Sequence, residues 1–342
     1  MGATLDRRVT VRHFERRVMG SALRLTLRSD GPDAERFDAG WEAVSDEFDA
    51  SDLAMSRFRS DAEIAEANDR AGTQVPYFVS ARLYAALALA DRARRITAGR
   101  FDGRILADLE RLELRGQPHP SRPGGRGNVA RRAGGDADSA WRSTVSLRRV
   151  DAARSRIHRW PRQRAIALDD PVDLGGIGKG LALRWAWHRL ARLLAIGPVT
   201  GALLEAGGDI TGGGVAPDGG PWRIAIEDPR GGDDPLAVLE LVSGAICTSS
   251  IRVNQWVDAG GRRLHHLVDP ATGEPGDEGL LAVTVAGPDP AWAEVWAKAL
   301  FLTAPDRIGE YARSRGLAAW WVADDGAISM TPAARALCIW ER

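Results

Sequence analysis

The sequence predicts an α+β protein in which runs of short strands are separated by long helices. Two stretches, 33–58 and 80–99, carry apolar residues at helical spacing. The alternating stretch 222–226 (WRIAI) is typical of a half-buried strand. Because the strands come in runs and do not alternate one by one with helices, we do not expect a regular βαβ series.

In the first part of the chain, we expect a strand over 18–27 and then an amphipathic helix over 33–58, with Phe37 on its apolar face. A second helix is expected over 80–99, because Ser80 is a good N-cap and arginines fill the last turns, where cations favour the helix dipole.

The stretch 116–138 is rich in Gly, Pro and Arg and has little to bury, so we expect a flexible surface loop there. No repeat is visible, and the whole chain, 1–342, is interpreted as one domain. The remaining expected elements are a helix from the glycines at 178–180 to about 196, strands on both sides of 243–244, a strand over 279–287 and a helix over 291–303.

Composition excludes several classes of protein. Forty-six basic residues balance 46 acidic ones, so the chain lacks the charge of a general nucleic-acid binder. Two cysteines, Cys247 and Cys338, cannot form a disulfide framework or a Cys-rich zinc site. No stretch approaches the about 20 apolar residues of a membrane span, and no signal-peptide core is visible. We therefore expect a cytoplasmic protein without nucleic-acid or membrane partners.

The basic residues are almost all arginine, and the two lysines are Lys179 and Lys298. A GC-rich coding bias accounts for most of this imbalance. Lysine presents a compact point charge where arginine presents a broad planar fork, so a site that needs a small ammonium would retain lysine. The two lysines are therefore candidate functional residues.

The densest candidate site is the stretch VDLGGIGKG, which contains Asp173, Gly176 and Lys179. Its glycines leave backbone N–H groups uncovered, a helix begins directly after them, and Lys179 adds a positive charge, so the stretch suits an anion. It is not a phosphate-binding GxxxxGK[ST] loop, because Gly180 follows the lysine. A structural strand-to-helix turn remains an equal alternative.

Three further stretches have a similar character: EAGGDI with Gly207, Gly208 and Asp209; AICTSS with Thr248 and Ser249; and LHHLVDPATG with His266 and Asp269. Paired glycines permit close backbone approach, and hydroxyls, imidazoles and carboxylates can bind polar ligands. A His-His pair is more often a packing feature than a functional one. Zinc ligand spacing and a GxSxG nucleophile elbow are both missing.

In this order, the stretches resemble motifs of the ApbE family, the FAD:protein FMN transferases. The resemblance covers nearly the whole chain apart from 116–138. The matching segments are 18–20, 55–68 and 99–102 in the first half, and 173–180, 207–210, 226–229, 248–250, 266–273 and 294–300 in the second.

The resemblance implies T-fold-related antiparallel sheets with packed helices and a flavin site in a cleft. It implies FAD as substrate, Mg²⁺ at the pyrophosphate, and transfer of FMN to a Ser or Thr hydroxyl of an acceptor protein with release of AMP. His266 and Asp269 would lie beside the phosphates as catalytic residues. The residues implied in FAD binding are Met19, Phe58, Arg100, Phe101, Asp102, Asp173, Lys179, Gly207, Gly208, Asp209, Thr248, Ser249 and His266.

The chain departs from the family pattern at the metal. The resemblance implies a ligand set of the Gly176 carbonyl and an Asp and a Thr on the last helix of the motif, but those two positions hold Glu294 and Lys298. Residues four apart face the same way on a helix, so both still point to one place, and a simple surface ion pair is the alternative. An ammonium cannot ligate a cation. Either the metal is lost or displaced, or Lys298 supplies the positive charge itself as a catalytic residue.

Two other functions stay open at this stage: hydrolysis of FAD to FMN and AMP, and flavin binding without catalysis. The sequence does not identify the acceptor or the oligomeric state.

Overall fold

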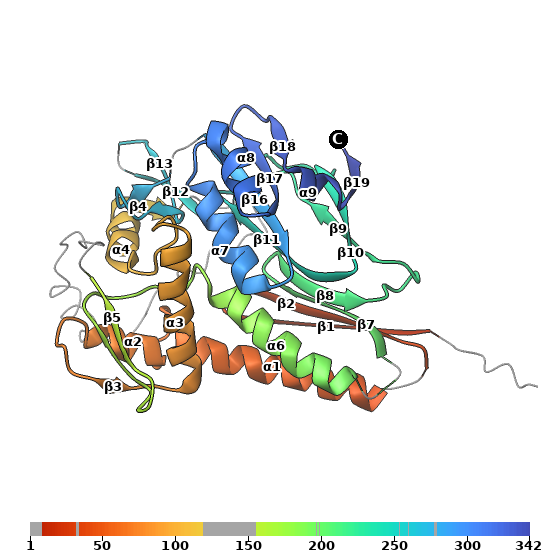
Figure 1. Cartoon of the computed structure of the whole chain (residues 1–342), viewed down its shortest axis with the longest axis horizontal. Helices are drawn as coiled ribbons and strands as arrows, with labels where there is room; N and C mark the ends of the chain where they lie inside the picture. Colours follow the sequence, from red (N-terminus) through yellow and green to blue (C-terminus); the bar gives the residue numbers. More distant parts are fainter. Residues whose placement is uncertain are drawn as a thin grey trace, which may run out of the picture.

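The computed structural model describes residues 9–31, 34–118, 155–195, 197, 199–252, 254–258, 260–276 and 279–342. Its central feature is an eight-stranded antiparallel sheet with the strand order β1-β2-β7-β8-β11-β16-β17-β18 (Figure 1). These strands are β1 (Thr10–Val18), β2 (Ser21–Ser29), β7 (Val199–Ala206), β8 (Asp209–Gly214), β11 (Ser243–Ser250), β16 (Leu280–Gly287), β17 (Ala318–Ala323) and β18 (Ile328–Met330).

Four smaller sheets surround the central one. One combines β9 (Trp222–Ile226), β10 (Ala237–Leu241) and β19 (Cys338–Glu341), and another combines β4 (Gly116–Pro118), β12 (Gln255–Asp258) and β13 (Arg263–His265). The others are the pair β14 (Val268–Asp269) and β15 (Glu274–Pro275), and the group β3 (Tyr77–Phe78), β5 (Ile157–Trp160) and β6 (Ala165–Leu168).

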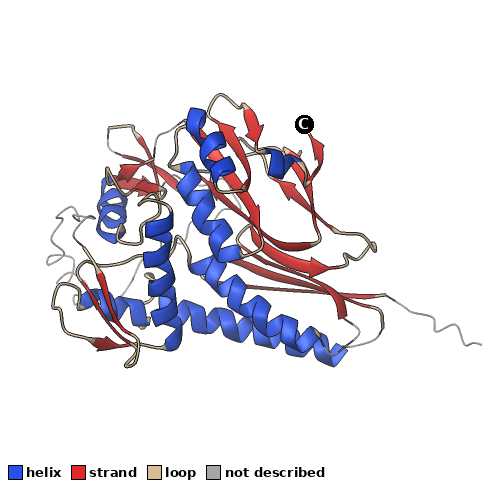
Figure 2. Ribbon diagram, viewed as in Figure 1, coloured by secondary structure: helices blue, strands red, loops and turns tan. Residues whose placement is uncertain are grey.

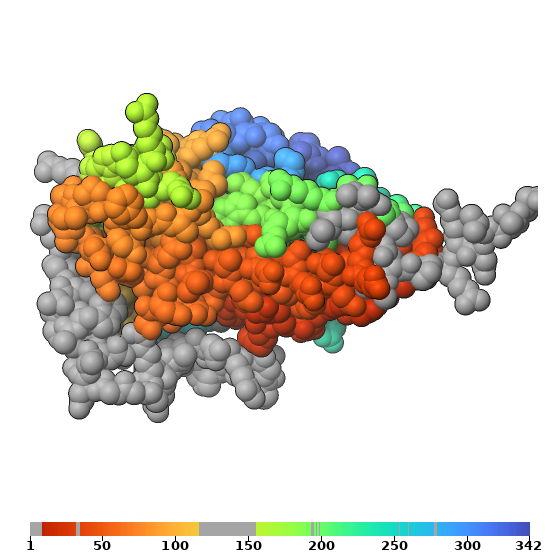
Figure 3. All heavy atoms as spheres, turned by 90° about the horizontal axis from the view of Figure 1, so that it is seen from below, coloured from red at the N-terminus to blue at the C-terminus, as the bar shows by residue number. Residues whose placement is uncertain are grey.

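Long helices pack against the central sheet, as Figure 2 shows. The described helices are α1 (Ala34–Met55), α2 (Glu63–Asp69), α3 (Ala81–Ile96), α4 (Leu106–Arg115), α6 (Gly178–Leu194), α7 (Pro290–Phe301), α8 (Pro305–Ser314) and α9 (Pro332–Arg335). Helix α6 packs beside α1 and also contacts α7, which lies on β11 and β16. Seen from below, α1 and α6 run side by side across the molecule (Figure 3). The predicted α+β class is confirmed.

The core next to the candidate site forms between β2, α1 and α6. Leu23, Leu25 and Leu27 alternate along β2 and are fully buried on one face of the sheet. They form one cluster with Phe37 of α1 and Leu183 of α6. The burial of this shared apolar surface holds the middle of α6 against the sheet.

The predicted helices are confirmed, with ends shifted by a few residues. The helix expected over 33–58 is α1, and the one expected over 80–99 is α3. The hydroxyl of Ser80 accepts a hydrogen bond from the N–H of Leu83 at 3.1 Å, so Ser80 is the N-cap that the sequence indicated.

The strand expected over 18–27 is confirmed as β2 over 21–27, but it begins three residues later, because the chain turns back at 19–20. Met19 and Gly20 have φ angles of +49° and +72° and connect β1 to β2, with Val18 opposite Ser21. A two-residue turn with both φ angles positive matches the twist of an antiparallel hairpin. Met19 lacks the usual turn chemistry of Asn, Asp or Gly, so nothing in its residue type marked the turn.

The loop expected over 116–138 is described only at its beginning. Residues 116–118 form β4 and pair with β12, while 119–138 lie outside the described residues. The single-domain organisation and the loop remain predictions. Among the helices described, none combines the length and apolar character needed to span a bilayer.

Candidate active site

The glycine-rich turn at 173–180 connects the end of β6 to α6. Asp173 holds its start, since its N–H donates to the carbonyl of Gly103 at 2.6 Å and its carboxylate accepts the N–H of Gly175 at 3.0 Å. The N-cap residue of α6, Ile177, provides no side-chain hydrogen bond to the first turn. The N–H of Gly178 donates to the carbonyl of Leu174 within the turn at 2.7 Å, so only the amides that follow need groups from elsewhere in the fold.

One of those groups comes from α7. The N–H of Gly180 donates to Oε2 of Glu294 at 2.8 Å. A Cβ atom on Gly180 would lie 2.6 Å from Cα of Ala291, so a larger residue would push the helices apart. Gly180 thus allows the backbones of α6 and α7 to touch, and this contact places Glu294 at the start of α6.

Four charged residues meet at this point, and we call Lys179, Asp209, Glu294 and Lys298 the four-charge cluster. Nζ of Lys179 lies 3.1 Å from Oδ2 of Asp209 and 3.2 Å from Oε1 of Glu294. Nζ of Lys298 lies 3.2 Å from the same Oε1. The side chains of Asp209 and Glu294 are only 4% and 2% exposed. Two ammonium groups therefore share two recessed carboxylates.

Electrostatics keeps the central pair of the cluster ionised. Burial opposes the charge on Glu294, but Lys179, Lys298 and the Gly180 N–H outweigh it and lower the pKa of the carboxyl. Burial likewise opposes the charge on Lys179, while Asp209 and Glu294 raise the pKa of its ammonium above its usual range. Both groups are therefore charged at neutral pH.

The donor set at this place does not fit Mg²⁺. That ion prefers six oxygen ligands, whereas Glu294 uses Oε1 for two ammonium groups and Oε2 for an amide. A Cβ on Gly176 would lie 3.3 Å from Cδ of Lys298, so the lysine stem fills the space beside the expected carbonyl ligand. In the described part of the chain, no three His, Cys, Asp or Glu side chains group together around a metal-sized space. We derive no step through a metal.

Two hairpin tips from the central sheet rest on the start of α6. Gly207 and Gly208, with φ angles of +61° and +91°, form the turn between β7 and β8. A Cβ on Gly207 would lie 3.8 Å from Cδ of Lys179, and one on Gly178 would lie 3.6 Å from Cε of Met19. The structure therefore brings Met19 and the Gly207–Gly208 turn next to the cluster, as the sequence suggested.

Thr248 and Ser249 do not share one environment. The N–H of Thr248 donates to Oδ1 of Asp209 at 3.2 Å, and its exposed side chain lies 2.9 Å from the Thr284 hydroxyl. Ser249 is buried, and its hydroxyl has no hydrogen-bond partner among the residues described. Successive strand residues point to opposite faces, and Cys247, on the same face as Ser249, contacts the carbonyl of Pro290 in α7. Ser249 therefore lies on the face that α7 covers, and Thr248 reaches Asp209 through its backbone N–H alone.

His266 is a half-buried neutral imidazole near Lys298. Its Nδ1 lies 3.3 Å from the carbonyl oxygen of Asn254, which can only accept, so we assign the proton to Nδ1 and leave Nε2 unprotonated. Loss of water around the ring and the positive charge of Lys298 lower the pKa of His266 to about 3. Nε2 can therefore accept a proton, but an imidazole with so low a pKa is a weak base.

Asp269 shapes the loop that carries His266. Its Oδ1 accepts the N–H of Ala271 at 2.9 Å, and its carbonyl accepts the N–H of Gly273 at 2.7 Å. This is an Asx-type turn, in which the side chain replaces a backbone acceptor. Part of the predicted role of Asp269 is thus structural.

The side chains of Arg100, Phe101 and Asp102 contact three different parts of the structure. Phe101 is buried against Gly176, where a Cβ on the glycine would meet its ring at 2.8 Å. Asp102 forms a buried ion pair with Arg104, with Oδ1 2.8 Å from Nε. The guanidinium of Arg100 lies over the ring of Tyr311 at 4.7 Å. Phe101 therefore supports the turn, and the other two are engaged elsewhere.

Phe58 joins the site through Arg57, a residue that the sequence analysis did not select. Phe58 is 70% exposed, and the Arg57 guanidinium stacks over its ring at 4.2 Å. Nε of Arg57 lies 3.4 Å from Oδ1 of Asp173. Burial raises the pKa of Asp173, although Arg57 acts in the opposite direction. No spacing in the sequence links positions 57 and 173, because the contact is purely tertiary.

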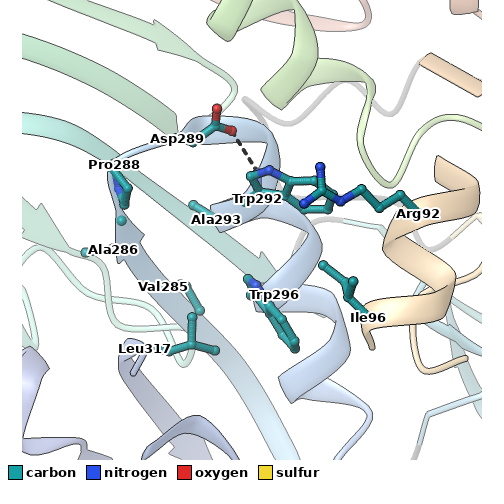
Figure 4. Close-up of a pocket in the computed structure, with 11 residues that line it drawn as sticks. Arg92, Ile96, Val285, Ala286, Pro288, Asp289, Trp292, Ala293, Trp296 and Leu317 are labelled. Carbon is teal, nitrogen blue, oxygen red and sulfur yellow. Dashed lines mark hydrogen bonds between the residues drawn. The ribbon is translucent and has the colours of Figure 1, made fainter. Parts of the chain in front are cut away.

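A separate pocket lies on the other face of α7 (Figure 4). Trp292 and Trp296 of α7 line it, and Arg92 of α3 faces them. Glu294 and Lys298 are about half a turn away at 100° per residue, so this pocket is distinct from the four-charge cluster.

The fold and site define an α+β protein with a glycine-rich helix start, two lysines and two recessed carboxylates set against an antiparallel sheet. The chain belongs to the ApbE family, whose family model matches residues 19–321. The resemblance expected from the sequence is confirmed.

Individual relatives agree with this assignment. The FAD:protein FMN transferase of Escherichia coli (strain K12) is 30% identical over 155 residues, or 45% of this chain and 43% of that protein, so this match spans less than half of either. The FAD:protein FMN transferase of Haemophilus influenzae is 25% identical over 329 residues, covering 93% of this chain and 88% of that protein. The crystal structure of the ApbE protein from Thermotoga maritima has a TM-score of 0.77 at 22% identity, covers 97% of this chain and 100% of its own, and shows the same fold.

Proposed function

We propose that this chain is an FAD:protein FMN transferase, which cleaves FAD and attaches FMN to a Ser or Thr hydroxyl of an acceptor protein with release of AMP. The observation that carries the proposal is the meeting of Lys179 and Lys298 at Glu294, at the start of α6, with His266 close enough for the charge of Lys298 to lower its pKa. The relatives that are FAD:protein FMN transferases support it. Phosphoryl transfer needs positive charge on the phosphates and a base near the attacking hydroxyl, and these residues provide both.

In this proposal, the FAD pyrophosphate binds at the first turn of α6, where the positive end of the helix dipole favours an anion. Lys179 and Lys298 neutralise its charge. The flavin end extends toward Met19 and Phe58, both next to the turn. Asp269 keeps the His266 loop in place.

The proposed step conserves all atoms. The acceptor oxygen forms a bond to the phosphorus of the FMN half, and its proton moves to Nε2 of His266. The bond from that phosphorus to the bridging oxygen breaks, and AMP leaves with that oxygen. The negative pyrophosphate would raise the pKa of His266 from about 3, which makes the imidazole a better base when FAD is bound.

The test is incubation of the purified protein with FAD and a protein carrying a Ser/Thr flavinylation site, followed by AMP quantification and mass spectrometry of the acceptor. AMP together with an FMN mass increase supports the proposal. AMP and free FMN alone indicate FAD hydrolysis, and neither product indicates a flavin-binding protein without catalysis. The cytoplasmic location stays a prediction, to be tested by cell fractionation.

A further inference from the structure

In the four-charge cluster, the two ammonium groups are more exposed to solvent than the two carboxylates. The side chains of Lys179 and Lys298 are 26% and 18% exposed, against 4% and 2% for Asp209 and Glu294. An approaching anion therefore meets ammonium groups first. The carboxylates are already occupied by the lysines, Gly180 and Thr248.

Two contacts position Lys298: its aliphatic stem packs beside Gly176, and its ammonium pairs with Glu294. Its Cδ and Cε lie 3.3 and 3.5 Å from the place where a Gly176 Cβ would stand. Gly175 is exposed and Gly176 half-buried, so the stem lies close to backbone that is partly accessible. Glu294, on the preceding turn of α7, holds the ammonium there.

A divalent cation at this place would meet two ammonium groups and no free carboxylate among the residues described. Like charges at such short range repel strongly, and burial reduces the screening by water. A pyrophosphate, in contrast, approaches the more exposed ammonium groups, while the two carboxylates that would repel it lie deeper and are already paired with the lysines.

We propose that the Lys298 ammonium replaces the divalent cation of this site, so that the chain binds the pyrophosphate of FAD through fixed lysine charges and needs no Mg²⁺. This inference rests on the proposed function, because it assumes FAD as the ligand. It changes the source of the positive charge, and it leaves the acceptor and the products as described above.

The first experiment uses the unmodified full chain. FAD affinity is measured by flavin fluorescence in excess EDTA and in millimolar Mg²⁺, and AMP release is measured in both. We expect the two dissociation constants to agree within about 3-fold. Tight binding only with Mg²⁺ overturns the inference and leaves the proposed function intact. No FAD binding in either buffer overturns both.

The second experiment changes the charge. Lys298→Met keeps an unbranched apolar stem but removes the ammonium, and we expect FAD binding in EDTA to weaken by about 10-fold or more. Arg307→Met removes a positive charge from the exposed side of α8 and serves as the matched control, with little expected change. Equal effects of the two substitutions would show that only net charge matters, which contradicts the inference.

The third experiment restores oxygen ligands in the double variant Glu294→Asp, Lys298→Thr. Binding of Mn²⁺ is followed by electron paramagnetic resonance without FAD, so the readout does not depend on activity. We expect Mn²⁺ binding and an FAD affinity that increases about 10-fold with Mg²⁺ in the double variant, and no Mn²⁺ binding in the wild type. Mn²⁺ binding by the wild type at this site would overturn the inference.

Discussion

Replacement of Lys179 by methionine would leave two recessed carboxylates with one remaining ammonium. In the folded protein, Lys179 lies 3.1 Å from Asp209 and 3.2 Å from Glu294, while Lys298 reaches only Glu294 in this cluster. Lys179→Met keeps most of the apolar stem, so the main loss is the positive charge. We expect a large decrease in the free energy of unfolding.

The magnitude follows from the distances. At an effective dielectric constant of about 20, each contact near 3.1 Å has a gross Coulomb energy of about 5 kcal/mol. Desolvation of the ammonium offsets much of this energy, and breaking one side of a buried ion pair destabilises a protein by about 3–5 kcal/mol. We therefore expect a loss of about 3–5 kcal/mol for Lys179→Met at neutral pH.

The loss should depend on pH. In the wild type, the lowered pKa of Glu294 stabilises the fold above the ordinary value of 4.5, and that contribution disappears as the pH falls through the folded pKa. Without Lys179, one of the two ammonium groups that favour the charged carboxylate is lost, so burial raises the pKa of Glu294 in the folded state. The carboxyl then takes up a proton in the folded state, so the deficit of the variant shrinks toward about pH 5.

The assay is urea unfolding followed by the fluorescence of the 12 tryptophans, near neutral pH and at about pH 5. Arg307→Met, on the exposed side of α8, serves as the control and should change the free energy of unfolding by less than about 0.5 kcal/mol. A deficit for Lys179→Met below about 1 kcal/mol, or one of equal size at both pH values, would refute the argument that Lys179 compensates recessed charges.

Three further predictions concern single side chains. Gly180→Ala should destabilise the fold by about 1–3 kcal/mol in thermal unfolding, because the added Cβ would collide with the backbone of α7. Gly287→Ala is the control, since nothing lies within 4 Å of the place where its Cβ would stand. Equal effects of the two substitutions would contradict the close contact at Gly180. His266→Ala should lower AMP release by about 10²- to 10⁴-fold with an unchanged melting temperature, and full activity would remove this loop from the mechanism. Asp102→Asn should cost about 3–5 kcal/mol in urea unfolding, since it weakens a buried ion pair, while FAD affinity stays the same; weaker FAD binding at unchanged stability would instead place Asp102 in the ligand site.

Local periodicity was enough to predict the helices. The spacing of apolar residues after Phe37 and the N-cap at Ser80 are properties of neighbouring residues, and both appear in the structure. The hairpin at Met19 was missed for the same reason, because a methionine at positive φ carries no local turn signal.

Some of the selected residues are in contact in the structure. The sequence placed Glu294 and Lys298 on one face of a helix, with an ion pair between them as one alternative, and the structure has that contact. No sequence pattern linked Lys179 to Glu294, because that contact depends on the backbone contact at Gly180, which is a tertiary property. Asp102 shows the opposite case, since its partner Arg104 lies only two residues away and was not considered.

The contact at Gly180 has an evolutionary consequence. The two lysines come from different helices, and their spacing is fixed by touching backbones with no side chain between them. The distance between the α6 and α7 backbones at Gly180 stays the same when a side chain elsewhere on α7 is exchanged for another. The kind of positive charge offered at this position, a metal ion or an ammonium, can then change through one or two substitutions while the rest of the fold stays as it is.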